Sequence, residues 1–221
     1  LSVTDAILYE VTIDNVIQGS QESTTFTSST LQDGIHEIKV RSKDEMGNYS
    51  GYGSHIVLID TLAPLLPTPT TISPTNNNTP TWTWMASNDA VLYEVKLNGE
   101  VIIVQSKNTF ISEPLDDGIH IIEVRAKDKN NNWSEYGIHE VTIDTTPPNV
   151  PSPTTTSPTN NKKPTWSWQK SESDDLYEVS LNGISYGLQS QNTFTAQHDL
   201  PEGTSEIKVR AKDAIGNLSN F

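Results

Sequence analysis

Hydrophobic and polar residues alternate along most of the chain with a period of two. Residues 81–84 read Thr-Trp-Thr-Trp, so both indoles fall on one face of an extended segment. Residues 93–97 and 119–126 alternate in the same way, with Glu, Lys and Arg at the outward positions. No stretch carries a sustained helical period, so the sequence predicts an all-β protein.

The region 65–148 contains the full set of predicted strands. Asn98-Gly99 supplies the positive-φ residues of a tight hairpin turn, and Asp116-Asp117-Gly118 turns the chain before its longest alternating run. We label the strands A to G and expect them at 68–80 (A), 80–84 (B), 93–97 (C), 101–104 (C′), 109–111 (E), 119–126 (F) and 136–143 (G). The stretch labelled A suits an edge strand or an extended link, because its prolines cannot donate to a ladder.

The same pattern is written three times with a period of 84 residues. Leu8-Tyr9-Glu10 returns at 92–94 and at 176–178. A strict period of this size indicates one structural unit in tandem. We expect domains at 1–64, 65–148 and 149–221. From this phase we expect the first repeat to be without strands A and B, the third to be without its last strand, and the chain to be a window of a longer array.

The strand pattern favours a two-sheet sandwich around an inward Trp. Trp84 on strand B, Tyr93 on strand C and the run 124–134 resemble a fibronectin type III or bacterial Ig-like domain. Residues 59–64 and 143–148 resemble the linkers of tandem Ig-like repeats in large bacterial surface adhesins. The resemblance implies an all-β fold of tandem Ig-like/fibronectin III-like seven-stranded β-sandwiches arranged as an elongated rod.

Charge and composition narrow the function. The chain has 28 acidic and 14 basic side chains, a net charge of −14, which repels nucleic acid and anionic membranes. No run of about 18 apolar residues is present, so we expect no membrane insertion. The absence of Cys excludes disulfides and thiolate metal sites. With the Thr/Asn/Pro bias, this indicates an extracellular location on a bacterial cell surface.

Side chains with candidate chemistry have simpler structural interpretations. Trp82 and Trp84, repeated at 166 and 168, could form an aromatic platform for sugar rings, but residues on one face of a central strand are normally core. Glu94 and Arg125 should form a surface ion pair that contributes well under about 1 kcal/mol. No nucleophile–base–acid set or facing carboxylate pair is evident, so we expect no catalysis and no enzyme.

The most specific constellation is at the junctions between repeats. The turns between strands B and C and between F and G should approach the Asp that ends the preceding repeat. Converging carboxylate and amide oxygens are the ligands calcium requires, and the resemblance implies calcium-stiffened joints. Ordinary Asx-turn chemistry is the alternative. The candidate calcium ligands are Asp60, Asp89, Asp128, Asn130, Asn132, Asp144, Asp174, Asp175, Asp213 and Asn217.

These observations favour a non-enzymatic stalk or spacer segment of a bacterial extracellular, adhesin-type protein. Its partners would be flanking repeats of the same long chain. Three alternatives stay open: a glycan- or host-protein-binding module at the cell surface, an accessory domain of a secreted polysaccharide-degrading enzyme, and a filament subunit in which copies of the chain complement each other's strands. Near-uniform turns across the repeats favour the spacer.

Overall fold

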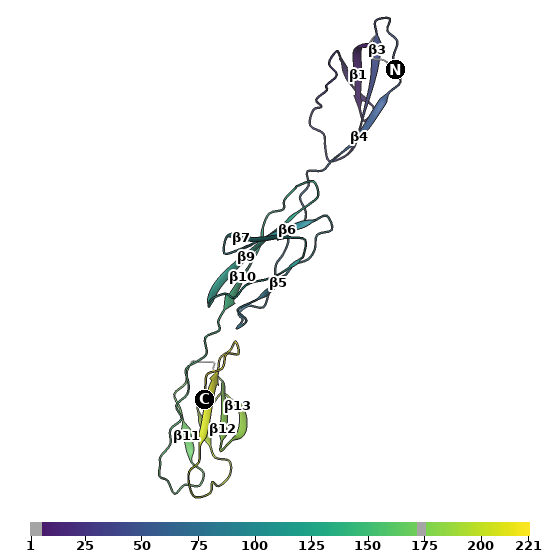
Figure 1. Ribbon diagram of the computed structural model, residues 1–221. Helices are drawn as coiled ribbons and strands as arrows, with labels where there is room; N and C mark the ends of the chain where they lie inside the picture. Colours follow the sequence, from purple (N-terminus) through teal and green to yellow (C-terminus); the bar gives the residue numbers. More distant parts are fainter. Residues whose placement is uncertain (1–5, 172–175) are drawn as a thin grey trace. The chain divides into compact units, whose positions relative to one another are not determined.

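The computed structural model describes residues 6–171 and 176–221, which form β-strands and no helix (Figure 1). Accordingly, no helix in the described part of the chain is long and apolar enough to span a membrane. The chain divides into two compact units. Unit 1 comprises Leu1–Leu65, Asn88–Val91 and Ala126–Ser134, and unit 2 comprises Leu66–Ser87, Leu92–Arg125 and Glu135–Phe221.

Unit 1 is built on one antiparallel sheet with strand order β2-β1-β3-β4. Its strands are β1 (Ala6–Ile13), β2 (Val16–Gln21), β3 (Gly34–Asp44) and β4 (Gly53–Ile59). Asp14 and Asn15 form the β1–β2 turn with φ of 51° and 66°, the left-handed region that Asp and Asn tolerate better than most residues. Val11 and Ile13 are buried, whereas Val57 on the edge strand is 38% exposed.

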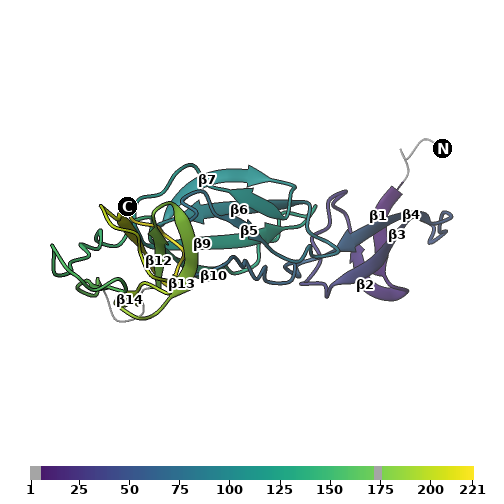
Figure 2. The ribbon, with the colours of Figure 1, turned by 90° about the horizontal axis from the view of Figure 1, so that it is seen from below.

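The middle repeat, most of which lies in unit 2, is a sandwich of two antiparallel sheets. One has the order β10-β9-β6-β7, and Figure 2 shows β9, β6 and β7 side by side. The other pairs β5 with β8. The strands are β5 (Thr81–Thr83), β6 (Leu92–Leu97), β7 (Glu100–Gln105), β8 (Thr109–Ile111), β9 (Gly118–Lys127) and β10 (Gly137–Ile143).

Alternate residues of these strands meet in one core, as the period of two predicts. Tyr93 is 2% exposed and Val95, Ile122 and Val124 are fully buried. The ring of Tyr93 lies edge-on to Trp84, with centroids 5.5 Å apart. Asn98 and Gly99 have φ of 53° and 85°, which confirms the predicted tight turn.

The third repeat also lies in unit 2 and repeats this arrangement with fewer strands. The sheet β13-β12-β15 faces the pair β11-β14. The strands are β11 (Thr165–Ser167), β12 (Leu176–Leu181), β13 (Ile184–Gln189), β14 (Thr193–Thr195) and β15 (Ile207–Lys212). Trp168, Tyr177 and Val179 form the centre of its core.

The sequence prediction for strands B, C, C′, E, F and G of the middle repeat is confirmed, and of the two alternatives for the stretch labelled A the structure shows an extended link and not an edge strand. Residues 68–80 make only two isolated bridges, Thr70 to Thr83 and Thr75 to Ile143. The prolines of this stretch limit it to single contacts. It still packs closely, because a Cβ at Gly137 would lie 1.7 Å from the carbonyl oxygen of Pro67. Only glycine fits there.

Candidate functional site at the joints between repeats

The turn after β9 is organised by the carboxylate of Asp128. Its Oδ1 accepts hydrogen bonds from the main-chain N–H groups of Asn130 and Asn132, both at 2.8 Å, and its Oδ2 accepts one from Asn132 Nδ2 at 2.8 Å. Asn131 sits at φ 74°, as an Asx-type turn allows. The side chain of Asn132 is therefore held with its amide nitrogen toward Asp128.

The second N–H of that amide reaches the residue that ends the first repeat. Asn132 Nδ2 donates to the main-chain oxygen of Asp60 at 3.0 Å, and Asn130 Nδ2 donates to Asp60 Oδ2. All of these residues belong to unit 1. We call this set of contacts the asparagine clasp.

The Asn132 part of the clasp recurs inside unit 2, where Ile215 stands at the position of Asn130. Asn217 Nδ2 donates to Asp213 Oδ2 and to the main-chain oxygen of Asp144, both at 2.8 Å. Asn217 is only 8% exposed. At each joint, one asparagine amide thus donates both to the Asp carboxylate of its own turn and to the main-chain oxygen of the Asp that ends the preceding repeat. The two asparagines, Asn132 and Asn217, are 85 residues apart in the sequence.

The residues after the terminal Asp are tied to the repeat they leave. Thr145 donates to Asp117 Oδ1 from its main-chain N–H at 2.8 Å and from its hydroxyl at 2.7 Å, and Thr146 Oγ1 donates to Asp117 Oδ2 at 2.5 Å. Thr61 makes the same two contacts with Asp33, at 3.1 and 2.9 Å. Each joint is therefore held from both sides.

The hydrogen bonds favour the ionised carboxylates. Burial alone would raise the pKa of Asp128, but the Asn132 side chain and three main-chain N–H groups outweigh it and hold that pKa below its usual value. The pKa of Asp213 is lowered against burial in the same way by Asn217. The hydroxyls of Thr146 and Thr145 are the main causes that lower the pKa of Asp117.

The structure places most of the predicted calcium ligands at these joints. Asp60, Asp128, Asn130 and Asn132 come together, as do Asp144, Asp213 and Asn217. Asp89 is exposed within unit 1, and Asp174 and Asp175 lie outside the described residues. The carboxylates are satisfied by N–H donors, and no group of three or more His, Cys, Asp or Glu able to hold a metal occurs within 6–171 and 176–221. Calcium at the joints stays a prediction.

The aromatic platform is not formed by the paired tryptophans. Trp82, Trp84, Trp166 and Trp168 are 0, 4, 6 and 4% exposed. Trp82 stacks on Phe110 with ring centroids 6.0 Å apart. These indoles are core, as the sequence predicted for residues on one face of a central strand.

The pair Glu94–Arg125 is less exposed than the sequence indicated. The Glu94 side chain is 13% exposed, and its Oε1 accepts from Arg125 Nε and Nη2, both at 2.9 Å, and from the Tyr136 hydroxyl. Arg125 also lies over the Tyr136 ring, 4.8 Å from its centroid. Burial and the Glu94 contact raise the pKa of Tyr136. The sequence analysis missed this aromatic cover, which shields the Glu94 carboxylate more than the Arg125 guanidinium from water.

A recurrent serine was also missed. The hydroxyl of Ser134 accepts from the N–H of Ala126 at 2.9 Å, and Ser50 and Ser219 do the same for Ser42 and Ala211, each at 2.9 Å. This bond fixes the segment that carries Tyr136 beside β9. The recurrence of Ser at this phase was the available signal.

No family model matches this chain, and no curated protein matches it in sequence. Solved structures with a similar fold include fibronectin(III)-like modules of Clostridium thermocellum CbhA, with 18% identity, a TM-score of 0.40, and 65% of this chain and 81% of that chain covered. The central fibronectin-III array of RIM-binding protein has 16% identity, a TM-score of 0.30, and coverage of 94% and 82%. Chitinase ChiA74 from Bacillus thuringiensis has 17% identity, a TM-score of 0.36, and coverage of 74% and 29%.

The sheet order β10-β9-β6-β7 against β5-β8, with a Trp and Tyr core, defines the class. The protein is a tandem array of Ig-like/fibronectin III-like β-sandwich repeats.

Proposed function

We propose that this chain is a non-enzymatic spacer, a segment of a bacterial extracellular protein of the adhesin type. The observation that carries the proposal is the asparagine clasp. A joint built twice around the same Asp–Asn turn and the main-chain oxygen of the Asp that ends the preceding repeat serves to hold consecutive repeats in order, whereas a recognition surface would be expected to vary between repeats.

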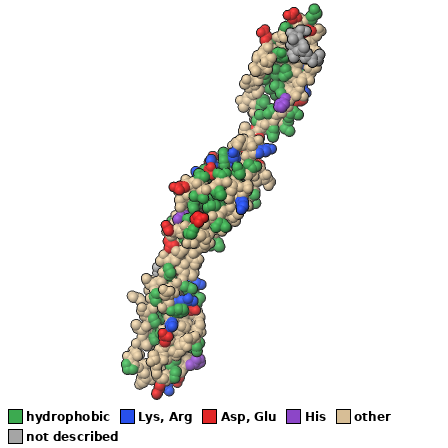
Figure 3. Space-filling model, viewed as in Figure 1, with side chains coloured by type: hydrophobic (Ala, Val, Ile, Leu, Met, Phe, Trp, Pro, Cys, Tyr) green, Lys and Arg blue, Asp and Glu red, His purple; other side chains and the backbone are tan. Residues whose placement is uncertain are grey.

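The distribution of charge supports this proposal. Acidic and basic side chains are interspersed on the face shown in Figure 3. The ion pairs Glu10–Arg41, Glu94–Arg125 and Glu178–Arg210 hold neighbouring strands together. Their roles are structural, which supports a chain without a catalytic task. The net charge of −14 favours solubility and discourages lateral association.

The experiment removes the clasp and measures the distances between repeats. In the Asn132→Ala/Asn217→Ala variant, the distance distribution between dyes in the first and third repeats should broaden. Asn48→Ala is the matched control, because Asn48 makes the same local bonds to Asp44, at 2.8 and 2.9 Å. An unchanged distribution in the double variant, with its core amides still protected from exchange, would refute the clasp as the ordering element. Specific binding to a glycan array would favour the recognition alternative.

A further inference from the structure

The edge strand β7 of the middle repeat is apolar on both faces. It lies at the end of the sheet order β10-β9-β6-β7 and, among the described residues, pairs only with β6 (Figure 2). The main-chain N–H and C=O groups along its other edge therefore face no strand. Its four central residues are Val101, Ile102, Ile103 and Val104, which are 55, 49, 39 and 47% exposed. Side chains on both faces of β7 are thus in contact with water.

The other two repeats provide an internal comparison for this edge. β2 and β13 occupy the place of β7, and both carry glycine where β7 has Ile103. These glycines are Gly19 and Gly187, with φ of 135° and 79°, a conformation that isoleucine rarely adopts. Glycine inside a strand weakens it as a template for pairing. All three strands have a register shift at this point, but only β7 keeps apolar side chains through it.

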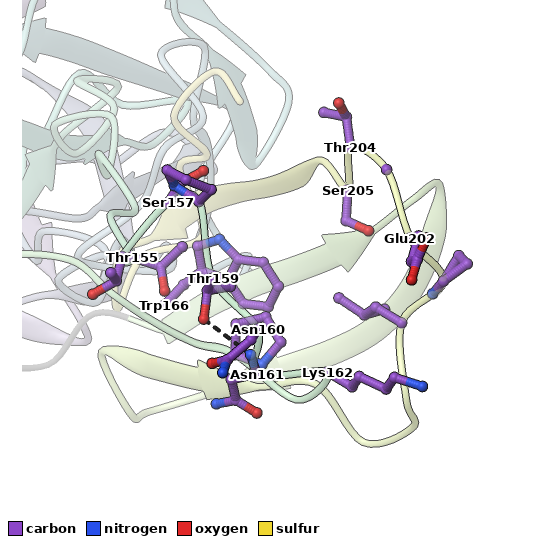
Figure 4. A pocket seen from close by; sticks show the side chains of 16 residues that line it. Thr155, Ser157, Thr159, Asn160, Asn161, Lys162, Trp166, Glu202, Thr204 and Ser205 are labelled. Carbon is purple, nitrogen blue, oxygen red and sulfur yellow. Dashed lines mark hydrogen bonds between the residues drawn. The ribbon is translucent and has the colours of Figure 1, made fainter.

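β7 belongs to the repeat in which every strand predicted from the pattern, B to G, is present. The groove of about 690 Å³ in the third repeat is a different case. Figure 4 shows Thr159 on one wall and Glu202 on the other. Thr159 stands at the position of Thr75, which bridges to Ile143 of β10 in the middle repeat. The fold accounts for that groove as the place of a last strand, whereas the pattern assigns no further strand to the open edge of β7.

The faces of the β7 side chains indicate which strand fits beside it. Val101 and Val104 lie opposite Lys96 and Glu94, the outward residues of β6. Residues opposite each other across a ladder share a face of the sheet, so both valines lie on the outer face. If two copies of β7 pair antiparallel about a two-fold axis at the centre of the strand, Val101 of each copy lies opposite Val104 of the other. The faces of the paired residues then match.

The remaining positions of β7 are complementary in the same register. Ile102 of each copy lies opposite Ile103 of the other, so the centre of the pair is apolar throughout. Glu100 lies opposite the uncharged Gln105. A parallel pair in register would instead place the two Glu100 side chains beside each other, and like charges directly opposite are destabilising. The strand is therefore self-complementary when it is antiparallel.

We propose that β7 pairs antiparallel with β7 of a second copy of this chain, so that two middle repeats share one continuous sheet. Main-chain hydrogen bonds provide affinity in such strand addition, and the side chains provide specificity. Both copies use the same patch, so the association closes as a dimer and does not propagate. Two six-residue strands bury less than the about 1,200 Å² of a standard interface, and the net charge of −14 opposes the approach of two copies. The dimer is therefore weak and is favoured by salt.

Sedimentation velocity on the full chain tests the pairing. The fraction of dimer should rise with protein concentration and with added salt, because salt screens the repulsion between two acidic copies. Ile103→Gly introduces the residue of the other two repeats and should weaken the dimer at least about 10-fold, because two isoleucine side chains are lost per dimer. Ile119→Gly removes an isoleucine that is 62% exposed on β9 and should leave the dimer unchanged. A chain that stays monomeric at every accessible concentration, or a dimer unaffected by Ile103→Gly, would overturn the proposal.

Cysteine cross-linking tests the register, since the chain has no Cys of its own. An oxidised mixture of the Val101→Cys and Val104→Cys chains should give a disulfide-linked heterodimer, because residues directly opposite have Cβ atoms about 4.5–5.5 Å apart. Either chain alone should give little cross-linked product. A mixture of the Ile17→Cys and Ser20→Cys chains is the matched control, because these residues hold the same positions in β2. Cross-linking as efficient in the β2 mixture, or in the single β7 chains, would contradict the proposed pair.

Discussion

The most direct test of the sandwich core is the replacement of Trp82. This side chain is completely buried on β5, stacks on Phe110 at an interplanar angle of 23°, and has no hydrogen-bond partner for its indole N–H among the described residues. Trp82→Ala removes the whole ring. Trp82→Phe keeps most of the ring and the stacking surface but removes the N–H.

The two substitutions should differ widely in cost. A buried Trp covers roughly 200 Å² of mostly apolar surface, which at about 25 cal/mol per Å² corresponds to about 5 kcal/mol. Removing an unsatisfied buried N–H returns about 1–3 kcal/mol. Trp82→Ala should therefore lower the free energy of unfolding of the middle repeat by about 2–4 kcal/mol. Trp82→Phe leaves only a small cavity and should change it by no more than about 1 kcal/mol.

Amide hydrogen exchange read separately in each repeat is the suitable assay, because a three-repeat chain need not unfold in one transition. Amides of β6 and β9 should lose protection in Trp82→Ala, while those of β12 and β15 should not. If Trp82→Phe costs as much as Trp82→Ala, the indole N–H has a polar partner and the reasoning fails. Unchanged protection in Trp82→Ala would place the indole outside the core.

Two further predictions concern charge. His36 Nδ1 faces Asp14 Oδ2 at 2.7 Å and Nε2 faces Gln32 O at 2.8 Å, so both nitrogens need protons and the pKa of His36 is raised, chiefly by Asp14. The His36–Asp14 pair therefore stabilises the fold below about pH 6.5, and this contribution is lost as pH rises through the raised pKa of His36. Asp14→Asn should abolish the pH dependence of the melting temperature in this range. An unaltered dependence of the melting temperature on pH in that variant would contradict the pairing. For the joints, calorimetry should show calcium binding with a dissociation constant in the millimolar to micromolar range, and calcium should raise the melting temperature. Asp60→Asn should remove both effects. If neither effect is seen in the original chain, calcium does not bind at the joint and only the hydrogen bonds hold it.

The strands and the core could be predicted because both depend on local patterns. The alternation at 93–97 assigns Tyr93 and Val95 inward, and the Asn98-Gly99 turn fixes the hairpin. For residues 68–80 the sequence left an edge strand and an extended link open, since its proline content does not show which single residues bond to a neighbouring strand.

The joints and the ion pairs could be predicted only in part, because their contacts join residues far apart in the sequence. Alternation shows that Glu94 points outward but does not show that Tyr136, 42 residues later, covers it. The convergence of Asn132 with Asp60 was expected, but not which end of the amide faces the joint. That orientation is set by Asp128, which accepts from the same nitrogen at 2.8 Å.

The ion pair between the two central strands is the same in every repeat, and this has a consequence for folding. Glu94 pairs with Arg125 across 31 residues, but Arg41 and Arg210 lie on strands of nearly the same sequence. Closing the native loop is favoured over closing the loop to Arg41 by only about 0.5 kcal/mol, because closure entropy depends weakly on loop length. A whole chain released from denaturant therefore has little to direct each strand to its own repeat. Synthesis from the N-terminus removes this competition, because each repeat can pair its strands before the next one has left the ribosome.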